Sequence, residues 1–317
     1  MSDEPGAYAH ANGIRLWYRD EGDPAGEPLL LVMGLNSQLI LWPDEFVAAL
    51  GERGFRVIRF DNRDCGLSDR IKADVDGRSP LYHLVDMAED ALGLLDHLGI
   101  DRAHVVGASM GGMIAQLMAI HHSERVRTLC SIMSTTGNPL VGQPSFEAVQ
   151  KLLEPTPPGR EEAIEHITGI YRVIGSRTHA NTEEARRRDL ATASYDRAFH
   201  PQGAKNQFDA IAAAVDRTRG LRELTMPTLV VHGAEDSLIT ISGGLATHNA
   251  VPDSTYLSFP DMGHDLPRPL WRELVDAITA NARTANANVM ATESITTRAI
   301  PAEAAADPSS TNAVTPA

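Results

Sequence analysis

A serine flanked by two glycines is the strongest sign of chemistry in this chain of 317 residues. The pentapeptide Gly107-Ala108-Ser109-Met110-Gly111 has the form G-x-S-x-G and joins an apolar run, residues 103–106, to a helix-compatible run, residues 110–121. This arrangement is typical of a nucleophile elbow, a sharp turn that exposes a serine hydroxyl. The two glycines would leave room for the turn, and the helix N-terminus would stabilise negative charge beside the serine. A packing turn without chemistry is the competing interpretation of the pentapeptide taken alone.

A catalytic serine needs a general base, and the base needs an acid that orients it. We predict His264 as the base, because it follows a late strand in a loop that contains glycine. Its main competitor among the 12 histidines is His232, which ends another late strand. We predict Asp236 rather than Glu235 as the acid, and Asp236 could also cap the next helix. The order serine, acid, histidine is that of enzymes with a nucleophile elbow.

An oxyanion hole needs two backbone N–H donors near the serine. Met110 follows the serine and supplies one predicted donor. Leu35, in the loop after the apolar run 29–33, supplies the other, and Gly34 allows the chain to turn there. Three polar side chains in this loop could contact the substrate or only satisfy the loop backbone: Asn36, Ser37 and Gln38.

The composition limits the class of protein. The formal net charge is −14, from 28 basic and 42 acidic residues, which argues against a general nucleic-acid binder. Cys65 and Cys130 could form one disulfide, but two isolated cysteines are more typical of a reducing compartment. Residues 1–13 lack the segments of a secretory signal, and no apolar run approaches the ~20 residues that span a bilayer. We expect a cytoplasmic protein without a membrane span, and the oligomeric state stays open.

Short apolar runs alternate with helix-compatible runs along most of the chain. Five runs are apolar on both faces, as in strands that are covered on both sides of a sheet: residues 29–33, 57–60, 103–106, 129–133 and 228–231. Three segments have helical periodicity: residues 44–53, 81–98 and 268–280. Residues 14–19 alternate, which predicts a half-exposed antiparallel edge strand. The whole pattern predicts an α/β fold, with a mostly parallel sheet flanked by helices.

Strand signals stop between about residues 138 and 220, while helical signals persist. We predict an inserted all-helical lid over the strand ends, with a helical bulge that has no role at the site as the alternative. Four aromatic side chains could line an apolar pocket of small-molecule size or hold the lid to the core: Tyr171, Tyr195, Phe199 and Phe208. The predicted domains are the core at residues 8–137 and 223–284, the cap at 138–222 and a disordered tail at 285–317.

Several spaced motifs together resemble the α/β-hydrolase superfamily over nearly all of residues 9–281. The elbow and the loops of the predicted acid and base agree with that family. Residues 61–68, with the sequence DNRDCGLS, resemble its D-x-R-G-x-G-x-S turn, with Asp64 where glycine is usual. The usual His-Gly of the oxyanion loop is Met33-Gly34 here. These variants and residues 42–46, WPDEF, are similar to the branch that contains aclacinomycin methylesterase.

The resemblance implies a Ser-His-Asp carboxylic ester hydrolase that acts on small-molecule esters without a cofactor or a metal, with Leu35 and Met110 as oxyanion donors. Related enzymes with an aspartate nucleophile do not fit, because residue 109 is serine. Four other readings stay open: a C–C bond hydrolase, a perhydrolase, a thioesterase or lipase, and a ligand receptor without catalysis on the same fold. The sequence does not specify the acyl group or the alcohol of the substrate.

Overall fold

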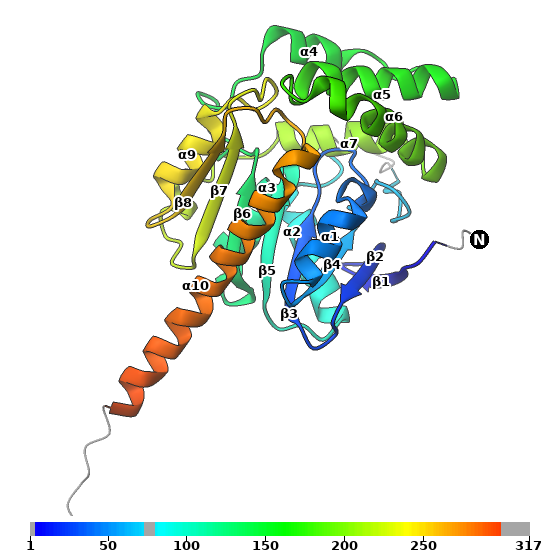
Figure 1. Cartoon of the computed structure of the whole chain (residues 1–317). Coiled ribbons are helices and arrows are strands. Elements are labelled where there is room, and N and C mark those ends of the chain that lie inside the picture. Colours follow the sequence, from blue (N-terminus) through cyan, green and yellow to red (C-terminus); the bar gives the residue numbers. More distant parts are fainter. Residues whose placement is uncertain (1–3, 73–79, 299–317) are drawn as a thin grey trace, which may run out of the picture. The chain divides into compact units, whose positions relative to one another are not determined.

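The described residues form a sheet of eight strands in the order β1-β2-β4-β3-β5-β6-β7-β8 (Figure 1). The computed structural model describes residues 4–72 and 80–298, with side chains to residue 285. The strands are β1 (Ala7–Ala11), β2 (Ile14–Gly22), β3 (Glu27–Val32), β4 (Phe55–Phe60), β5 (Ala103–Ala108), β6 (Val126–Ile132), β7 (Thr228–Gly233) and β8 (Thr255–Phe259). All neighbouring pairs from β4 to β8 are parallel, whereas β2 pairs antiparallel with both β1 and β4. The predicted α/β fold with a mostly parallel sheet is confirmed.

The predicted edge strand at residues 14–19 is real, but it is not at the edge. β2 lies between β1 and β4, and β1 and β8 are the two edge strands of the sheet. Asn12 and Gly13 form the two-residue connection from β1 to β2, with φ values of 47° and 80°. Two successive positive φ angles are what a type I′ hairpin turn requires, and Asn-Gly is its preferred sequence. The Asn12-Gly13 dipeptide is therefore a sequence signal for a hairpin, and thus for β1, which was not predicted.

Helices cover both faces of the sheet because its central strands are apolar on both sides. Along β3, Leu30 and Val32 pack into one core with α2 (Leu84–His97), α3 (Met110–His121) and α9 (Ser242–Ala250). Leu29 and Leu31 point to the other face and pack with α1 (Asp44–Gly51) and α10 (Trp271–Arg298). The chain also contains three short 3-10 helices: η1 (Leu39–Leu41), which buries Leu39, η2 (Ser123–Arg125) and η3 (Arg268–Leu270).

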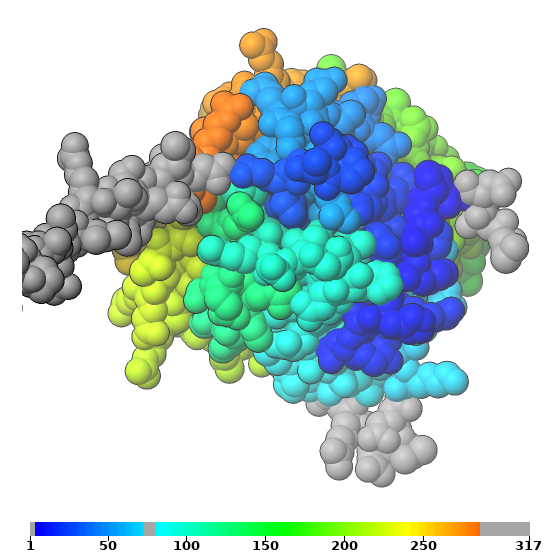
Figure 2. All heavy atoms as spheres, turned by 90° about the horizontal axis from the view of Figure 1, so that it is seen from below, coloured from blue at the N-terminus to red at the C-terminus, as the bar shows by residue number. Residues whose placement is uncertain are grey.

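The chain between β6 and β7 contains only helices among its regular elements. They are α4 (Phe146–Leu153), α5 (Arg160–Ile174), α6 (Ala180–Arg197), α7 (Pro201–Ala212) and α8 (Thr218–Leu221). We call residues 138–222 the helical insertion. Its helices α4 to α6 lie at one end of the sheet, and only their rim is visible from the opposite end (Figures 1 and 2). The described residues up to Ala285 form one compact unit that includes both the sheet and this insertion.

The end of the chain differs in part from the prediction. The backbone of α10 stays helical to Arg298, past residue 285 where the disordered tail was expected to begin. The rest of the predicted tail, residues 299–317, lies outside the described residues.

Candidate active site

Ser109 occupies the sharp turn between β5 and α3. Its φ of 55° and ψ of −120° are unfavourable for a residue with a side chain. A Cβ atom on Gly107 would lie 2.1 Å from the carbonyl oxygen of Gly111, and one on Gly111 would lie 2.1 Å from that of Val32. Both contacts are with backbone, so these positions accept only glycine while the turn keeps its shape. The geometry is that of a nucleophile elbow.

The structure brings the three predicted side chains together at the carboxyl ends of their strands. His264 Nε2 lies 2.9 Å from Ser109 Oγ, and His264 Nδ1 lies 2.8 Å from Asp236 Oδ2. Asp236 follows β7 and His264 follows β8, so three loops that are distant in the sequence contribute one residue each. Asp236 and His264 are buried. A serine, an imidazole and a carboxylate in this order can act as nucleophile, base and orienting acid.

Asp236 stays ionised because several donors face it. Burial alone would raise the pKa of this carboxyl, but the charge of His264 and the hydrogen bonds of His264 and His232 outweigh burial and lower the pKa to about 2. Oδ1 also accepts the N–H groups of Leu238 and Ile239, each at 2.9 Å. Asp236 therefore caps the turn after β7 as well as contacting the histidine. It does not cap α9, whose N-cap residue is Ile241.

The structure separates the competing residues from the serine. Glu235 points to the helical insertion, where it accepts the N–H groups of Arg177 and Thr178 at 2.6 and 3.0 Å. His232 is fully buried behind Asp236, with Nε2 2.7 Å from the Ile239 carbonyl oxygen and 3.4 Å from Asp236 Oδ2. The position of this second histidine beside the acid was not predicted, although His232 ends β7 only four residues before Asp236.

The predicted oxyanion loop forms a tight turn against the serine. Ser37 N–H donates to the Gly34 carbonyl at 3.2 Å, and Asn36 adopts a φ of 52°. A Cβ atom on Gly34 would lie 3.1 Å from that of Ser109, so this glycine permits close approach rather than an unusual φ. Within the described part of the chain, the N–H groups of Leu35 and Met110 donate to no protein acceptor. Both groups are therefore available to a bound oxygen.

The polar side chains of this loop bind the protein itself. Ser37 Oγ donates to the Leu35 carbonyl at 3.0 Å. Gln38 Nε2 donates to the carbonyls of Ser194 and Ala198 in the helical insertion, at 2.7 and 3.0 Å. For these two side chains the contacts favour the expectation that they satisfy backbone groups.

The helical insertion also holds the loop that carries His264. The Ile174 carbonyl accepts the His264 N–H at 2.7 Å, and Ser176 Oγ accepts the Gly263 N–H at 2.8 Å. Ser176 donates from both its N–H and its hydroxyl to Asp265 Oδ1, at 2.9 and 2.5 Å. Arg187, from α6, donates to the other oxygen of Asp265 at 2.8 Å. The residues on both sides of the candidate base are thus fixed by the insertion, a set of contacts that no local sequence signal reveals.

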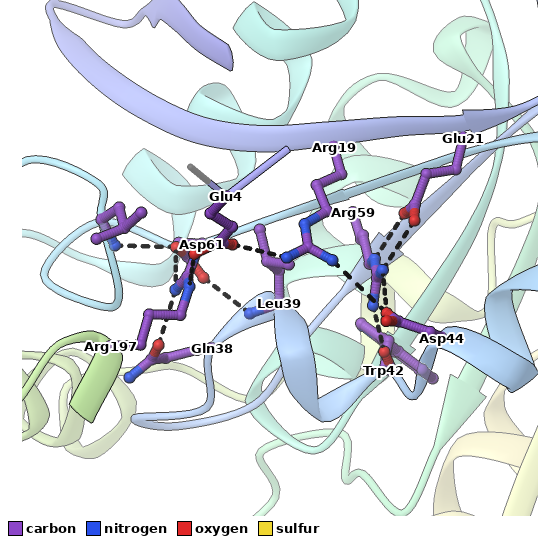
Figure 3. Close-up of polar contacts among 11 residues, drawn as sticks. Glu4, Arg19, Glu21, Gln38, Leu39, Trp42, Asp44, Arg59, Asp61 and Arg197 are labelled. Atoms are coloured by element: carbon purple, nitrogen blue, oxygen red, sulfur yellow. Dashed lines mark hydrogen bonds and ion pairs between the residues drawn. The ribbon is translucent and has the colours of Figure 1, made fainter. Parts of the chain in front are cut away.

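A buried ionic network connects the insertion to the D-x-R turn (Figure 3). Arg197, at the end of α6, lies 2.8 Å from Asp61 and 2.7 Å from Glu4. Asp61 also accepts the N–H groups of Leu39 and Leu67, at 2.8 and 2.9 Å. Burial raises the pKa of the Asp61 carboxyl, and Arg197 and the two N–H groups limit this rise. The network stabilises the segment between the oxyanion loop and α1.

Other predicted features have plain structural outcomes. Cys65 and Cys130 are both free and buried, so the possible disulfide is absent. The rings of Tyr195 and Phe199 pack on each other with centroids 4.6 Å apart, while Phe208 is 48% exposed.

No helix in residues 4–72 and 80–298 is long and apolar enough to cross a membrane.

Comparison with known proteins agrees with this geometry. The alpha/beta hydrolase fold family matches residues 27–164. The rhodomycin D methylesterase DnrP of Streptomyces peucetius is 31% identical over 293 residues, which cover 86% of this chain and 96% of that relative. The enol-lactonase of Burkholderia xenovorans LB400 superposes with a TM-score of 0.68 at 26% identity, over 89% of this chain and all of that chain. The chain belongs to the α/β-hydrolase family, and its methylesterase relatives support a carboxylic ester hydrolase.

Proposed function

We propose that this protein hydrolyses carboxylic esters of small apolar molecules through an acyl-enzyme formed on Ser109. The observation that carries the proposal is the continuous hydrogen-bonded chain from Ser109 through His264 to Asp236. Two relatives named rhodomycin D methylesterases, each 31% identical, support a methyl ester as the substrate.

In this mechanism His264 Nε2 takes the hydroxyl proton while Ser109 Oγ bonds to the ester carbonyl carbon. The negative charge that forms on the carbonyl oxygen accepts hydrogen bonds from the N–H groups of Leu35 and Met110. Loss of one such donor typically costs ~3–4 kcal/mol of transition-state stabilisation. The C–O bond then breaks, and the alcohol leaves with the proton from His264. Water, deprotonated by the same histidine, hydrolyses the acyl-enzyme and releases the acid.

Replacement of Ser109 tests this function directly. We expect Ser109→Ala to lower turnover of p-nitrophenyl esters at least about 1,000-fold, because the nucleophile is lost. A fluorophosphonate should label the wild-type protein at Ser109 and leave the variant unlabelled. Ser123→Ala, at an exposed serine, is the matched control and should retain full activity. Wild-type turnover by the Ser109 variant would refute the proposal.

C–C bond hydrolysis is the second candidate, because relatives with that chemistry are also similar. The 2-hydroxymuconate semialdehyde hydrolase of Pseudomonas putida is 29% identical over 273 residues, which cover 83% of this chain and 89% of that relative. A comparison of kcat/KM for a methyl ester and for 2-hydroxymuconate semialdehyde separates the two candidates. A preference for the semialdehyde would replace ester hydrolysis as the main function.

A further inference from the structure

Ser134 is a buried serine that follows β6 and binds the backbone of the nucleophile elbow. Its hydroxyl donates to the Ser109 carbonyl at 2.9 Å. That carbonyl belongs to the peptide between Ser109 and Met110, and the N–H of the same peptide is a candidate oxyanion donor. The C=O and N–H bonds of a trans peptide lie in one plane and point in opposite directions. A bond that holds the Ser109 carbonyl therefore also sets the direction of the Met110 N–H.

The conformation of this peptide needs support. Ser109 combines a φ of 55° with a ψ of −120°, which is unfavourable for a residue with a side chain. The peptide could turn about its two flanking Cα atoms without displacing α3, and the N–H would then leave the oxyanion. Two N–H groups of the first turn of α3, those of Gly112 and Met113, bind the carbonyl at 2.9 and 3.2 Å. Ser134 adds a third bond from a different element, so the peptide is tied to the sheet as well as to the helix.

The hydroxyl of Ser134 is itself held in place. Met133 adopts a φ of 41°, so the chain turns sharply out of β6 directly before Ser134. Directly after it, the buried side chain of Arg217, from the helical insertion, donates to the Thr135 carbonyl at 2.9 Å. Gly112 leaves the room that this contact needs, because a Cβ atom there would lie 2.6 Å from that of Ser134. The elbow and the loop after β6 thus fit each other closely.

The other candidate oxyanion donor is held differently. Ser37 N–H binds the Gly34 carbonyl, which lies on the same peptide as the Leu35 N–H. Gln207, from α7, accepts the Asn36 N–H at 2.7 Å, one peptide further along, and so ties the helical insertion to the loop rather than to the donor. In the described part of the chain, the donor at the elbow is therefore the one whose peptide is bound by a side chain.

We propose that Ser134 is a positioning residue for ester hydrolysis, whose hydroxyl holds the elbow peptide so that the Met110 N–H faces the oxyanion. The inference rests on the proposed function. The bond to the carbonyl also polarises the peptide and makes its N–H a stronger donor. An oxyanion donor acts mainly in the transition state, so loss of this bond should slow the chemical step and leave substrate binding almost unchanged.

The test is Ser134→Ala. The Ser109 carbonyl keeps its two donors from α3, so the protein should fold. We expect kcat to fall about tenfold, per active site titrated to completion with a fluorophosphonate, with KM changed less than about threefold. The Ki of a trifluoromethyl ketone, which forms an oxyanion in the same hole, should rise in parallel. A defect in folding alone would lower the number of titrated sites and leave these per-site values unchanged.

Two further variants keep the test decisive. Ser131→Ala, at a buried serine of β6 that accepts Gln116 Nε2 at 3.2 Å, is the matched control and should keep the wild-type kcat and Ki per site. If Ser134→Ala does not fold, Ser134→Cys should show the same loss in direction, because a thiol is a weak donor. Unchanged kcat and Ki in the folded variant, or an equal loss in the control, would overturn the inference. Full activity of Ser109→Ala would instead overturn the proposed function.

Discussion

Ser109 adopts an unfavourable backbone conformation, which places its side chain where a substrate can reach it. Strain of this kind costs of order 1–3 kcal/mol and persists only where the surroundings impose it. Here the surroundings are backbone atoms, which come within 2.1 Å of the positions of missing Cβ atoms at Gly107 and Gly111. The two glycines are therefore part of the site, although neither can contact a reacting atom through a side chain.

We expect Gly111→Ala to displace the elbow. Its Cβ would meet the carbonyl oxygens of Val32 and Met33, at 2.1 and 2.8 Å, so the elbow must move. We expect a loss of about 1–3 kcal/mol of unfolding free energy, as for other overpacked sites. We also expect activity to fall at least tenfold, because displacement of a nucleophile by about 1 Å is costly. Chemical denaturation and ester turnover measure the two effects.

Gly51→Ala is the matched control for this prediction. Its Cβ would have only one neighbour, at 3.7 Å, and alanine favours the helix that contains it. The control should be as stable as the wild type or more stable. Wild-type stability and activity of Gly111→Ala would contradict the prediction, because the elbow would then accommodate the extra Cβ atom.

The loops of Asp236 and His264 begin at strands of the core, but contacts with the helical insertion hold them in place. The link between α5 and α6 binds the loop of His264 through Ser176 and binds Glu235, the neighbour of Asp236, through Arg177 and Thr178. The insertion therefore positions the candidate base and acid, in addition to any part it has in covering the site.

The prediction for this element is tested by Ser176→Ala. Loss of the hydroxyl leaves the buried Gly263 N–H without its acceptor and removes one donor to Asp265. An unsatisfied buried group of this kind costs about 1–3 kcal/mol, so thermal unfolding should begin at a lower temperature. We expect kcat to fall more than KM changes, because the loop of His264 loses its support. Thr182→Ala, at an exposed hydroxyl on α6, should change neither value, and equal effects in the two variants would contradict the prediction.

The sequence predicted the elements whose signal is local. Local patterns predicted the strand β5 and the elbow with its two glycines. Asp236 and His264 could also be chosen from their local context, because each follows a strand in a loop that contains glycine. β1 could also have been found from Asn12-Gly13. The contacts of Ser176 and Gln207 could not, because each pairs residues more than 80 positions apart through a single buried polar group. The helical continuation of α10 was missed because its sequence has few apolar residues to mark it.

The two ends of the parallel strands differ in function. The candidate site lies at the carboxyl ends of the parallel strands, as is usual for open α/β sheets. His104, near the amino end of β5, lies at the other end of the sheet and is buried, with Nδ1 2.9 Å from Thr128 Oγ1. Burial lowers the pKa of His104 to about 4, although the nearby Glu27 carboxylate opposes the shift. This histidine therefore affects stability rather than chemistry.

The last prediction follows from that shift. Between about pH 6.5 and pH 4 the unfolded chain binds a proton at His104 that the folded protein does not bind, so stability falls as the pH decreases through this window. The loss approaches about 3 kcal/mol at the acid end. Denaturant titrations at several pH values should show a flatter dependence for His104→Gln than for the wild type. His121→Gln, at an exposed histidine, should keep the wild-type slope, and parallel curves for all three proteins would contradict the assignment.

The bonds from Gln207, Ser176 and Thr178 to the core have a consequence for protein engineering. A cap grafted from a relative to change substrate preference must supply partners for Asn36, Asp265 and Glu235. We expect a chimera whose cap lacks these partners to lose catalytic rate. Exchange between family members should therefore transfer these three pairs together with the helices.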